Sequence, residues 1–502
     1  MNEPRFDWLP ILKAEFIDEL SNEIVKHINV QPKKGMSINK KKDSLHQIAT
    51  HIISGLFQAT VMSNKSKAIS IPMSNDYYNS KDVTGSKVQY SKDYTREVIN
   101  ALIDLNWIDS VTGSEATKKF TRISAKGFLL NKFKDIGFIW FEQKVLPERK
   151  TVLLRDVNRD ENNKPIRDKK SNKTTKFYMQ TPESQDVSRM RSNLKEINSF
   201  LVKQCISMDI DDDQLKAMLE ELSSGTDKEN INLYNVQLVR IFSRGSMEKG
   251  GRFYRGWWQA IPSKYRPLIR LNSKRTIEVD YSSIGLRILY ARVDMALPVE
   301  KDLYDIGLDN WIPFKDERRP IVKKVFNALI NDEDKVYKLE KKYKKVLGLT
   351  LDEFLDRVRE HHKPIFHLLR SDAGLESQKV DSDVAEQVML ELIYEGIPVL
   401  PIHDSFIVPV GYMIEPLLNG VFKRIVKQGI ACEAECVMGR EQFGKTKEEV
   451  LQEAEREIVV KGAELKDGLL NRKYSSIDYY VASGVFQGTC RLGLIFKPPY
   501  LS

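Results

Sequence analysis

Two segments of the sequence place an aspartate where a divalent cation could be held. Residues Thr276–Tyr290 read TIEVDYSSIGLRILY, and the alternation of polar and apolar residues before Asp280 predicts a strand that ends at this carboxylate. Residues Gly396–Pro409 read GIPVLPIHDSFIVP, which places Asp404 at a hairpin tip between two apolar strands. Either aspartate alone is equally explained as a turn or capping residue. Together they could clamp two Mg²⁺ ions about 3.5–4 Å apart, with Mn²⁺ as a substitute.

Such a pair of ions is suited to nucleotidyl transfer. One ion lowers the pKa of an attacking hydroxyl, and the other neutralises charge on the leaving pyrophosphate. Because little covalent work is required of the protein, positioning and charge would carry the catalysis. The elements that must position the two aspartates are therefore neighbouring strands, and another element must grip the nucleotide.

A helix is predicted between the two aspartates, in DERRPIVKKVFNALIND from Asp316 to Asp332. Its polar stripe is formed by residues that are each four apart: Arg319, Lys323, Asn327 and Asn331. Two cations followed by two amides suit a triphosphate and then its sugar and base. Pro320 belongs in a first turn and disfavours helix at the preceding residue, so we expect Arg319 just outside the helix. An ordinary amphipathic helix with a solvated stripe is the alternative.

Length, charge and cysteine content narrow the class of protein. A chain of 502 residues accommodates about three or four domains, and a net charge of +9 fits a polyanionic partner. Four cysteines are too few for a disulfide framework in such a chain. The sequence has no apolar run of about 18 residues and no secretory signal pattern at its start. We therefore expect a cytoplasmic protein without a membrane span.

The front part of the chain contains a pattern that resembles a winged helix. Tyr94, Val98 and Leu102 have helical spacing, and two strands follow around a turn at Thr112-Gly113. Three cations fall on the hairpin: Lys118, Lys119 and Arg122. In such a domain a helix enters the major groove and the wing contacts phosphate, although packing against the rest of the protein is the alternative. The polar stretch 158–176 is expected to be a flexible loop.

Four stretches, in order along the chain, resemble motifs of family A DNA polymerases. VDYSSIGLR resembles motif A, usually written DYSQIELR, and RPIVKKVFNALIN resembles motif B, the fingers helix. PIHDSF resembles motif C, which reads HDE in those DNA polymerases and HDS in the single-subunit phage RNA polymerases. GGRFYRGWWQAIP, from Gly250 to Pro262, is similar to the elements that precede motif A. The resemblance extends from Gly250 to about Gly444.

This resemblance implies an α+β fold of the right-hand type, with palm, fingers and thumb. It implies Asp280 and Asp404 as ligands of two Mg²⁺ ions, with the backbone carbonyl of Tyr281 as a further ligand. It implies Arg319 and Lys323 on the triphosphate. Four residues are implied near primer or template: Arg252, Gln259, Arg287 and His403. The implied partners are a DNA template with its primer, and nucleoside triphosphates.

The departures from the family pattern concern the sugar. The glutamate of DYSQIELR, which blocks a ribose 2′-OH in the DNA polymerases, is Gly285 here, as in the phage RNA polymerases. The aromatic and the tyrosine of motif B are Asn327 and Asn331, and Asn331 could bond a sugar hydroxyl. The preference between deoxynucleotides and ribonucleotides therefore stays open.

We expect the following domains. Residues 1–86 form an N-terminal helical region, 87–140 a winged-helix-like domain, 141–180 a connector with the flexible loop, and 181–249 a helical thumb-like region. Residues 250–299 and 376–445 form the palm, 300–375 the fingers, and 446–502 a C-terminal extension. The expected function is template-directed polymerisation of nucleotides. A single-subunit RNA polymerase or primase, and an inactive DNA-binding replication initiator, are the alternatives.

Overall fold

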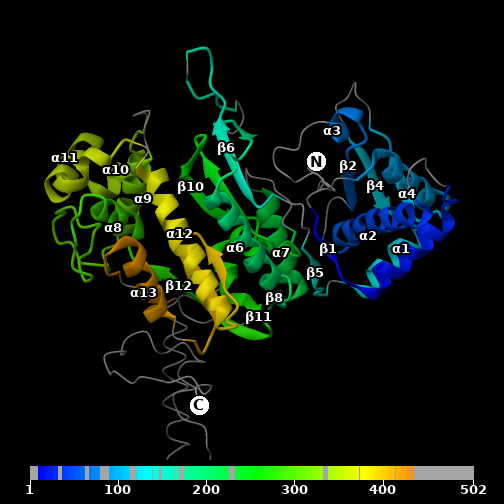
Figure 1. Ribbon diagram of the computed structural model, residues 1–502. Coiled ribbons are helices and arrows are strands. Elements are labelled where there is room, and N and C mark those ends of the chain that lie inside the picture. Colours follow the sequence, from blue (N-terminus) through cyan, green and yellow to red (C-terminus); the bar gives the residue numbers. More distant parts are fainter. Residues whose placement is uncertain are drawn as a thin grey trace, which may run out of the picture.

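The computed structural model describes residues 9–31, 37–62, 67–79, 90–113, 120–137, 139–145, 150–162, 164–168, 174–224, 232–331, 337–371, 373–412, 414–430 and 432–434. They form a mixed α+β fold. An N-terminal part, a central part with two sheets and a helical part that includes residues 284–371 follow one another across the molecule (Figure 1). No helix within these ranges is both long and apolar enough to cross a bilayer.

The N-terminal part packs helices against a small antiparallel sheet. Its helices are α1 (Glu15–His27), α2 (Ile38–Met62), α3 (Asn75–Asn79), α4 (Lys92–Asp104) and α5 (Gly127–Ile136). The sheet has the order β2 (Ala68–Ile71), β4 (Thr121–Ala125), β3 (Ile108–Val111), and β1 (Ile11–Leu12) pairs separately with β5 (Gln143–Lys144). Ser91 caps α4 by accepting from the backbone N–H of Tyr94, while Val98 and Leu102 are fully buried in the core of this part.

The helix and the two strands of the expected winged helix form where the spacing predicts them. A third strand, β2, comes from the region expected to be helical and pairs with β4, so the two regions share one sheet and one core. Lys118 and Lys119 lie outside the described residues. Arg122 lies on the central strand β4, half-buried, in register with Ser70 and Val111.

The first central sheet has four strands. Its order is β10 (Ser246–Tyr254), β9 (Val239–Ser243), β6 (Val152–Val157), β7 (Lys176–Met179), and only the β6–β9 pair is parallel among them. Helices α6 (Gln185–Leu201) and α7 (Asp212–Ser224) follow in the region expected to be thumb-like. Val187 and Met190 of α6 pack on Val152, Leu154 and Phe242, which covers one face of this sheet.

Parts of the stretch 158–176, expected to be a flexible loop, pair through their backbone, while residues 163 and 169–173 lie outside the described part of the chain. Lys176 begins β7, and isolated bridges join Arg159 to Pro165 and Arg167 to Thr174. The backbone N–H of Asn158 donates to Thr175 at 2.9 Å, and that of Thr175 donates to Ile166 at 2.8 Å. Paired strands can satisfy their own backbone in this way without an apolar face, so a polar composition does not exclude strand pairing.

The second central sheet has six strands. Its order is β13 (Leu400–Ile402), β14 (Ser405–Pro409), β12 (Lys274–Tyr281), β11 (Ile269–Leu271), β8 (Ile206–Met208), and β15 (Cys432–Ala434) also pairs with β12. Short 3-10 helices η2 (Trp257–Gln259) and η3 (Ser263–Leu268) precede β11. Helices α12 (Ala373–Tyr394) and α13 (Glu415–Val426) share the core of this sheet through Val388, Leu392, Leu418 and Phe422. Strands β11 to β15 come from the regions expected to be palm, β8 comes from the preceding region, and β10, which overlaps the expected palm, belongs to the first sheet instead.

The helical part has its own core. It comprises α8 (Ile284–Ala291), α9 (Arg319–Ile330), α10 (Lys341–Leu347), α11 (Leu351–His361) and η4 (Lys363–Leu368), packed around Leu289, Val325, Phe326 and Phe354. Arg319 is the first residue of α9, and not outside it as Pro320 predicts. Its backbone N–H donates to the carbonyl of Asp316 at 3.0 Å, so the turn that starts at Asp316 leads directly into the helix.

Candidate active site

The sheet brings Asp280 and Asp404 onto neighbouring strands at the same end. β12 and β14 are antiparallel, with Asp280 in register with Ser405, the residue after Asp404. The backbone N–H of Tyr281 donates to the carbonyl of Asp404 at 3.4 Å. Both aspartates are half-buried. Two acidic residues that are far apart in the chain therefore lie side by side in the fold.

The local geometry explains how each aspartate is presented. Ile402 and Ser405 pair across β13 and β14, so His403 and Asp404 form a two-residue hairpin loop. His403 has φ 56°, in the left-handed region that such tight loops require and that histidine tolerates better than most residues. After β12, Ser283 has φ 57°, and the chain turns there into α8.

A buried ion pair lies beside the aspartates. Arg252 of β10 bonds Asp381 of α12, with Nε–Oδ2 at 2.8 Å and Nη2–Oδ2 at 2.7 Å. Burial raises the pKa of the Asp381 carboxyl to about 6, and the nearby charge of Asp404 adds to the rise although Arg252 opposes it. Burial also opposes the charge of Arg252, but Asp381 and Asp404 more than offset this and raise the pKa of the guanidinium. The positive charge of Arg252 is therefore stabilised by the carboxylates of both Asp381 and Asp404.

The sequence carries a signal for Asp381, a residue that the motifs described above do not include. Asp381 lies on the same helical face as Val384 and Val388, both of which are fully buried. A carboxylate on a buried face must have a partner, so its position indicates a cation nearby.

His403 is neutral near pH 7. Burial, and then the charge of Arg252, lower its pKa to about 4. Its ring meets that of Tyr254 edge to face, with the centroids 5.9 Å apart. Ser405, next in the hairpin, donates to Glu278 Oε1 at 2.5 Å, and Glu278 also pairs with Arg266 at 3.2 Å. The tip of the hairpin is thus held by side chains from β10 and β12.

Gln259 and Arg287, two residues expected near primer or template, have hydrogen-bond partners within the protein. Gln259 Nε2 donates to the carbonyls of Phe253 and Pro401 at 3.1 and 3.0 Å, and its Oε1 accepts from the backbone of Gly256. Arg287 is 1% exposed and donates to the carbonyls of Pro298 and Val299. The spacing of a motif in the sequence does not reveal whether the side-chain donors of a polar residue already bond to backbone carbonyls.

The four residues of the polar stripe of α9 differ in their partners and their exposure. Arg319 pairs with Asp302 at 3.1 Å, and its guanidinium lies over the rings of Tyr304 and Phe314 at 5.0 and 5.5 Å. Lys323 follows one turn later and is half-buried. Asn327 and Asn331 are exposed, and Asn331 lies just past the helix end and donates to the carbonyl of Asn327 at 2.7 Å. The charge of Arg319 is thus balanced by a buried carboxylate.

Tyr304 is a second residue at the site that the motifs do not include. It is 3% exposed, and its ring lies between Arg319 and Phe326. Burial raises the pKa of its hydroxyl, as do the charges of Asp404 and Asp280, while Arg319 and a bond to Ser283 act in the opposite direction. The hydroxyl therefore lies within electrostatic reach of both aspartates, and no local pattern in the sequence signals this.

Gly285, the second residue of α8, has open space beside it. An ideal Cβ placed there meets no heavy atom within 4 Å. The neighbouring residues Ser283, Ile284 and Leu286 are buried. The first atom of a side chain at this position would therefore enter open space.

The donors at this site are oxygens. Asp280, Asp404 and the carbonyl of Tyr281 are the hard ligands that Mg²⁺ prefers, and Mg²⁺ commonly takes only one or two carboxylates and completes its shell with water and phosphate. Among the residues that the structure describes, no cluster of three or more His, Cys, Asp or Glu forms a ready-made metal cage. The donor set thus fits an ion that arrives with a phosphorylated substrate.

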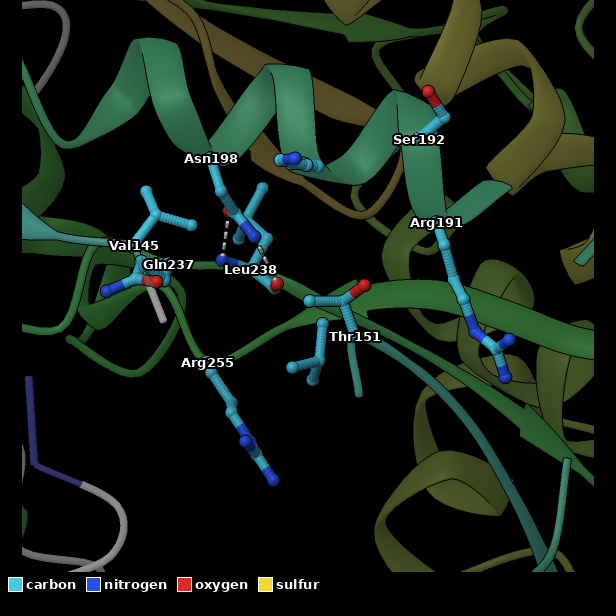
Figure 2. A pocket seen from close by; sticks show the side chains of 10 residues that line it. Val145, Thr151, Arg191, Ser192, Asn198, Gln237, Leu238 and Arg255 are labelled. Atoms are coloured by element: carbon cyan, nitrogen blue, oxygen red, sulfur yellow. Dashed lines mark hydrogen bonds between the residues drawn. The ribbon is translucent and has the colours of Figure 1, made fainter. Parts of the chain in front are cut away.

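A separate cavity of about 300 Å³ lies where β6 and β9 begin, against α6, and neither aspartate lines it (Figure 2). Arg255 and Arg191 extend on either side of Thr151. Asn198 uses its whole amide on the backbone of Leu238, at 2.7 and 2.9 Å. Arg191 pairs with Glu183. Since these polar groups are already partnered, the aspartate pair is the better candidate for a reaction site.

Comparisons with known proteins are sparse. No protein-family model and no curated protein matches this sequence. Among solved structures, the chain is similar to the POL domain of Pol1 from M. smegmatis in complex with DNA primer-template and dNTP, with 13% identity and a TM-score of 0.26. The match covers 50% of this chain and 50% of that one.

Proposed function

We propose that this protein is a template-directed nucleotidyltransferase that extends a nucleic-acid primer with nucleoside triphosphates. The observation that supports this most is the pairing of β12 with β14, which sets Asp280 beside the hairpin that carries Asp404. Four motif-like stretches, in family order, lie on the elements around this point. DNA is the proposed template.

In this proposal the two carboxylates and the Tyr281 carbonyl would hold Mg²⁺, which supplies activation of the attacking hydroxyl and charge neutralisation at the leaving pyrophosphate. Lys323 offers a cation to the phosphates from α9, while Arg319 is restrained by Asp302. Arg252 holds Asp381 and offsets the negative charge around Asp404. His403, neutral and packed on Tyr254, fixes the hairpin tip.

The test is primer extension with Mg²⁺ by wild type and by Asp404→Ala. We expect loss of at least about a thousandfold in rate, because removing one metal ligand removes charge stabilisation in the transition state. Glu395→Gln is the matched control, since this exposed acid lies just past the end of α12, and it should extend normally. Extension that persists in Asp404→Ala would remove this residue from the reaction.

A ribonucleotide-using enzyme, either an RNA polymerase or a primase, is the second candidate. The open space beside Gly285 favours it, because a ribose 2′-OH would meet no side chain there. Extension assays decide between a deoxynucleotide-using enzyme, an RNA polymerase and a primase. They compare deoxynucleotides with ribonucleotides, with and without a primer. DNA binding without extension on any template would favour an inactive initiator instead.

A further inference from the structure

The sheet β10-β9-β6-β7 has a second face, opposite the one that α6 covers. Strand register identifies its members, because residues paired across strands share a face and alternate residues along a strand do so too. Tyr254 pairs with Val239, Arg252 with Ile241, Ile241 with Leu153, and Arg155 with Tyr178. Lys176 pairs with Val157, two residues after Arg155. Leu153, Val239, Ile241 and Tyr254 form their own small cluster, which confirms that they lie together.

Cations and aromatic rings alternate on this face. We call it the cationic face, made of Arg155, Lys176, Tyr178 and Tyr254, with Arg244 at its edge. The guanidinium of Arg155 lies over the ring of Tyr254 at 5.9 Å. Tyr178 is 39% exposed, and Lys176 is exposed beside it. Arg244 and Gly245 both have positive φ and form the tight loop between β9 and β10, which presents Arg244 at the edge of the sheet.

The charges on this face repel one another. The pKa of Lys176 is lowered, first by desolvation of its ammonium group and then by the charges of Arg155 and Arg244. The buried Nε of Arg155 has no hydrogen-bond partner among the described residues. Like charges gathered in this way cost stability, and a polyanion would relieve the cost.

The cationic face begins at the candidate active site. Tyr254 contacts His403 ring to ring, and Arg252, two residues earlier on β10, bonds Asp381. β9 lies between β10 and β6 in this sheet, and the Arg155 side chain of β6 reaches Tyr254 of β10, so the row continues from Tyr254 across the sheet towards β7 (Figure 1). A strand that leaves the active site along this face would meet phosphate-binding and base-stacking groups in turn.

We propose that the cationic face binds a single-stranded nucleic acid, the template segment that has not yet been copied. This rests on the proposed function for the identity of the strand. Arg155, Lys176 and Arg244 take the phosphates, and the rings of Tyr178 and Tyr254 take bases by stacking, which every base offers irrespective of sequence. An unpaired strand is favoured over a duplex because the bases of a duplex are already stacked on one another.

The test uses the full chain and fluorescein-labelled single-stranded DNA, with binding followed by anisotropy over a range of salt. Arg155→Gln with Lys176→Gln should weaken binding about tenfold at low salt and reduce the salt slope by about 1.4, as expected for two lost phosphate contacts. Tyr178→Ala should weaken binding with little change in slope, since stacking releases no counterions. The charge-matched control is Lys203→Gln with Lys216→Gln, and it should bind as wild type. Lys203 is exposed just after α6, and Lys216 is exposed on α7.

Equal weakening in the control pair would overturn the proposal, because it would indicate a general charge effect. Weaker binding of duplex DNA with unchanged binding of single strands would assign the face to a duplex and also overturn it. Asp404→Ala should bind single-stranded DNA as wild type does. If wild type never extends a primer but the double variant still loses single-strand binding selectively, the proposed function fails while the cationic face stands.

Discussion

Gly285 lies five residues after Asp280 and is the second residue of α8. Its neighbours Ser283, Ile284 and Leu286 are buried, whereas a Cβ added at Gly285 would meet no atom within 4 Å. In the family A DNA polymerases, whose motif A the segment VDYSSIGLR resembles, a glutamate at this position excludes the ribose 2′-OH. Under the proposed function, the free space beside Gly285 leaves that steric barrier absent.

Gly285→Glu should therefore restore discrimination. We expect the kcat/KM for ribonucleotides to fall about tenfold or more while that for deoxynucleotides changes little, because the carboxylate crowds only the 2′ position. Single-nucleotide incorporation with each sugar measures both constants. Gly285→Ala is the control and should leave both unchanged. An equal loss for the two sugars would contradict the steric explanation.

Arg319 illustrates how one partner changes the role of a residue. On an isolated helix it would be a cation for a triphosphate, but Asp302, whose side chain is 2% exposed, bonds it at 3.1 Å. Its guanidinium also covers the ring of Tyr304. Arg319 thus joins α9 to the loop that carries Tyr304, and Lys323 becomes the principal cation of the stripe.

At the scale of elements, the β13–β14 hairpin carries Asp404, which the proposed function assigns to metal binding. It is braced from η2: Trp258 Nε1 and Gln259 Nε2 each donate to the carbonyl of Pro401 at 3.0 Å. Gln259 also ties this carbonyl to Phe253 of β10. These hydrogen bonds from Trp258 and Gln259 therefore join η2, β13 and β10 around the site.

Gln259→Ala should act as loss of a brace rather than loss of a primer contact. We expect the free energy of unfolding to fall by about 1–3 kcal/mol, because the buried carbonyls of Phe253 and Pro401 lose a donor. Chemical denaturation measures this, and Gln387→Ala, an exposed glutamine of α12, should stay within about 0.5 kcal/mol of wild type. A raised KM for primer with unchanged stability would instead support a direct primer contact.

At the scale of the whole molecule, three cores are separate: that of the N-terminal part, that of the second central sheet and that of the helical part. The segment just before β9 connects the first two. Tyr234 is 3% exposed within the N-terminal core, donates to Ile139 at 2.8 Å and accepts through its carbonyl from Gln143. Asn232 donates to Gln58 of α2 at 2.8 Å.

Tyr234→Ala should loosen the N-terminal part from the rest. Removing a buried ring costs about 3–5 kcal/mol, and the cost falls on the N-terminal core. We expect calorimetry to show an earlier transition for this part, with primer extension retained below it. Tyr234→Phe keeps the ring and should shift the transition only slightly. A single transition that moves as a unit would show that the parts unfold together.

Local patterns determined the elements of this protein. The alternation before Asp280, the two apolar runs around Asp404 and the helical spacing of residues 94–102 each predict an element that the structure contains. The reason is physical: periodicity reports which face of a strand or helix is buried, and that depends on a few adjacent residues. The boundaries were less certain, as the start of α9 at Arg319 rather than after it shows.

Tertiary structure alone decided which partners these elements meet. It paired β2 with β4, set Asp381 on Arg252, placed Tyr304 near both aspartates, and occupied Gln259 and Arg287 with backbone carbonyls. It also gathered Arg155, Lys176 and Tyr254 on one face from three strands. Such contacts join residues far apart in the chain, and local spacing carries no information about them because the same pattern can pack against many different surfaces.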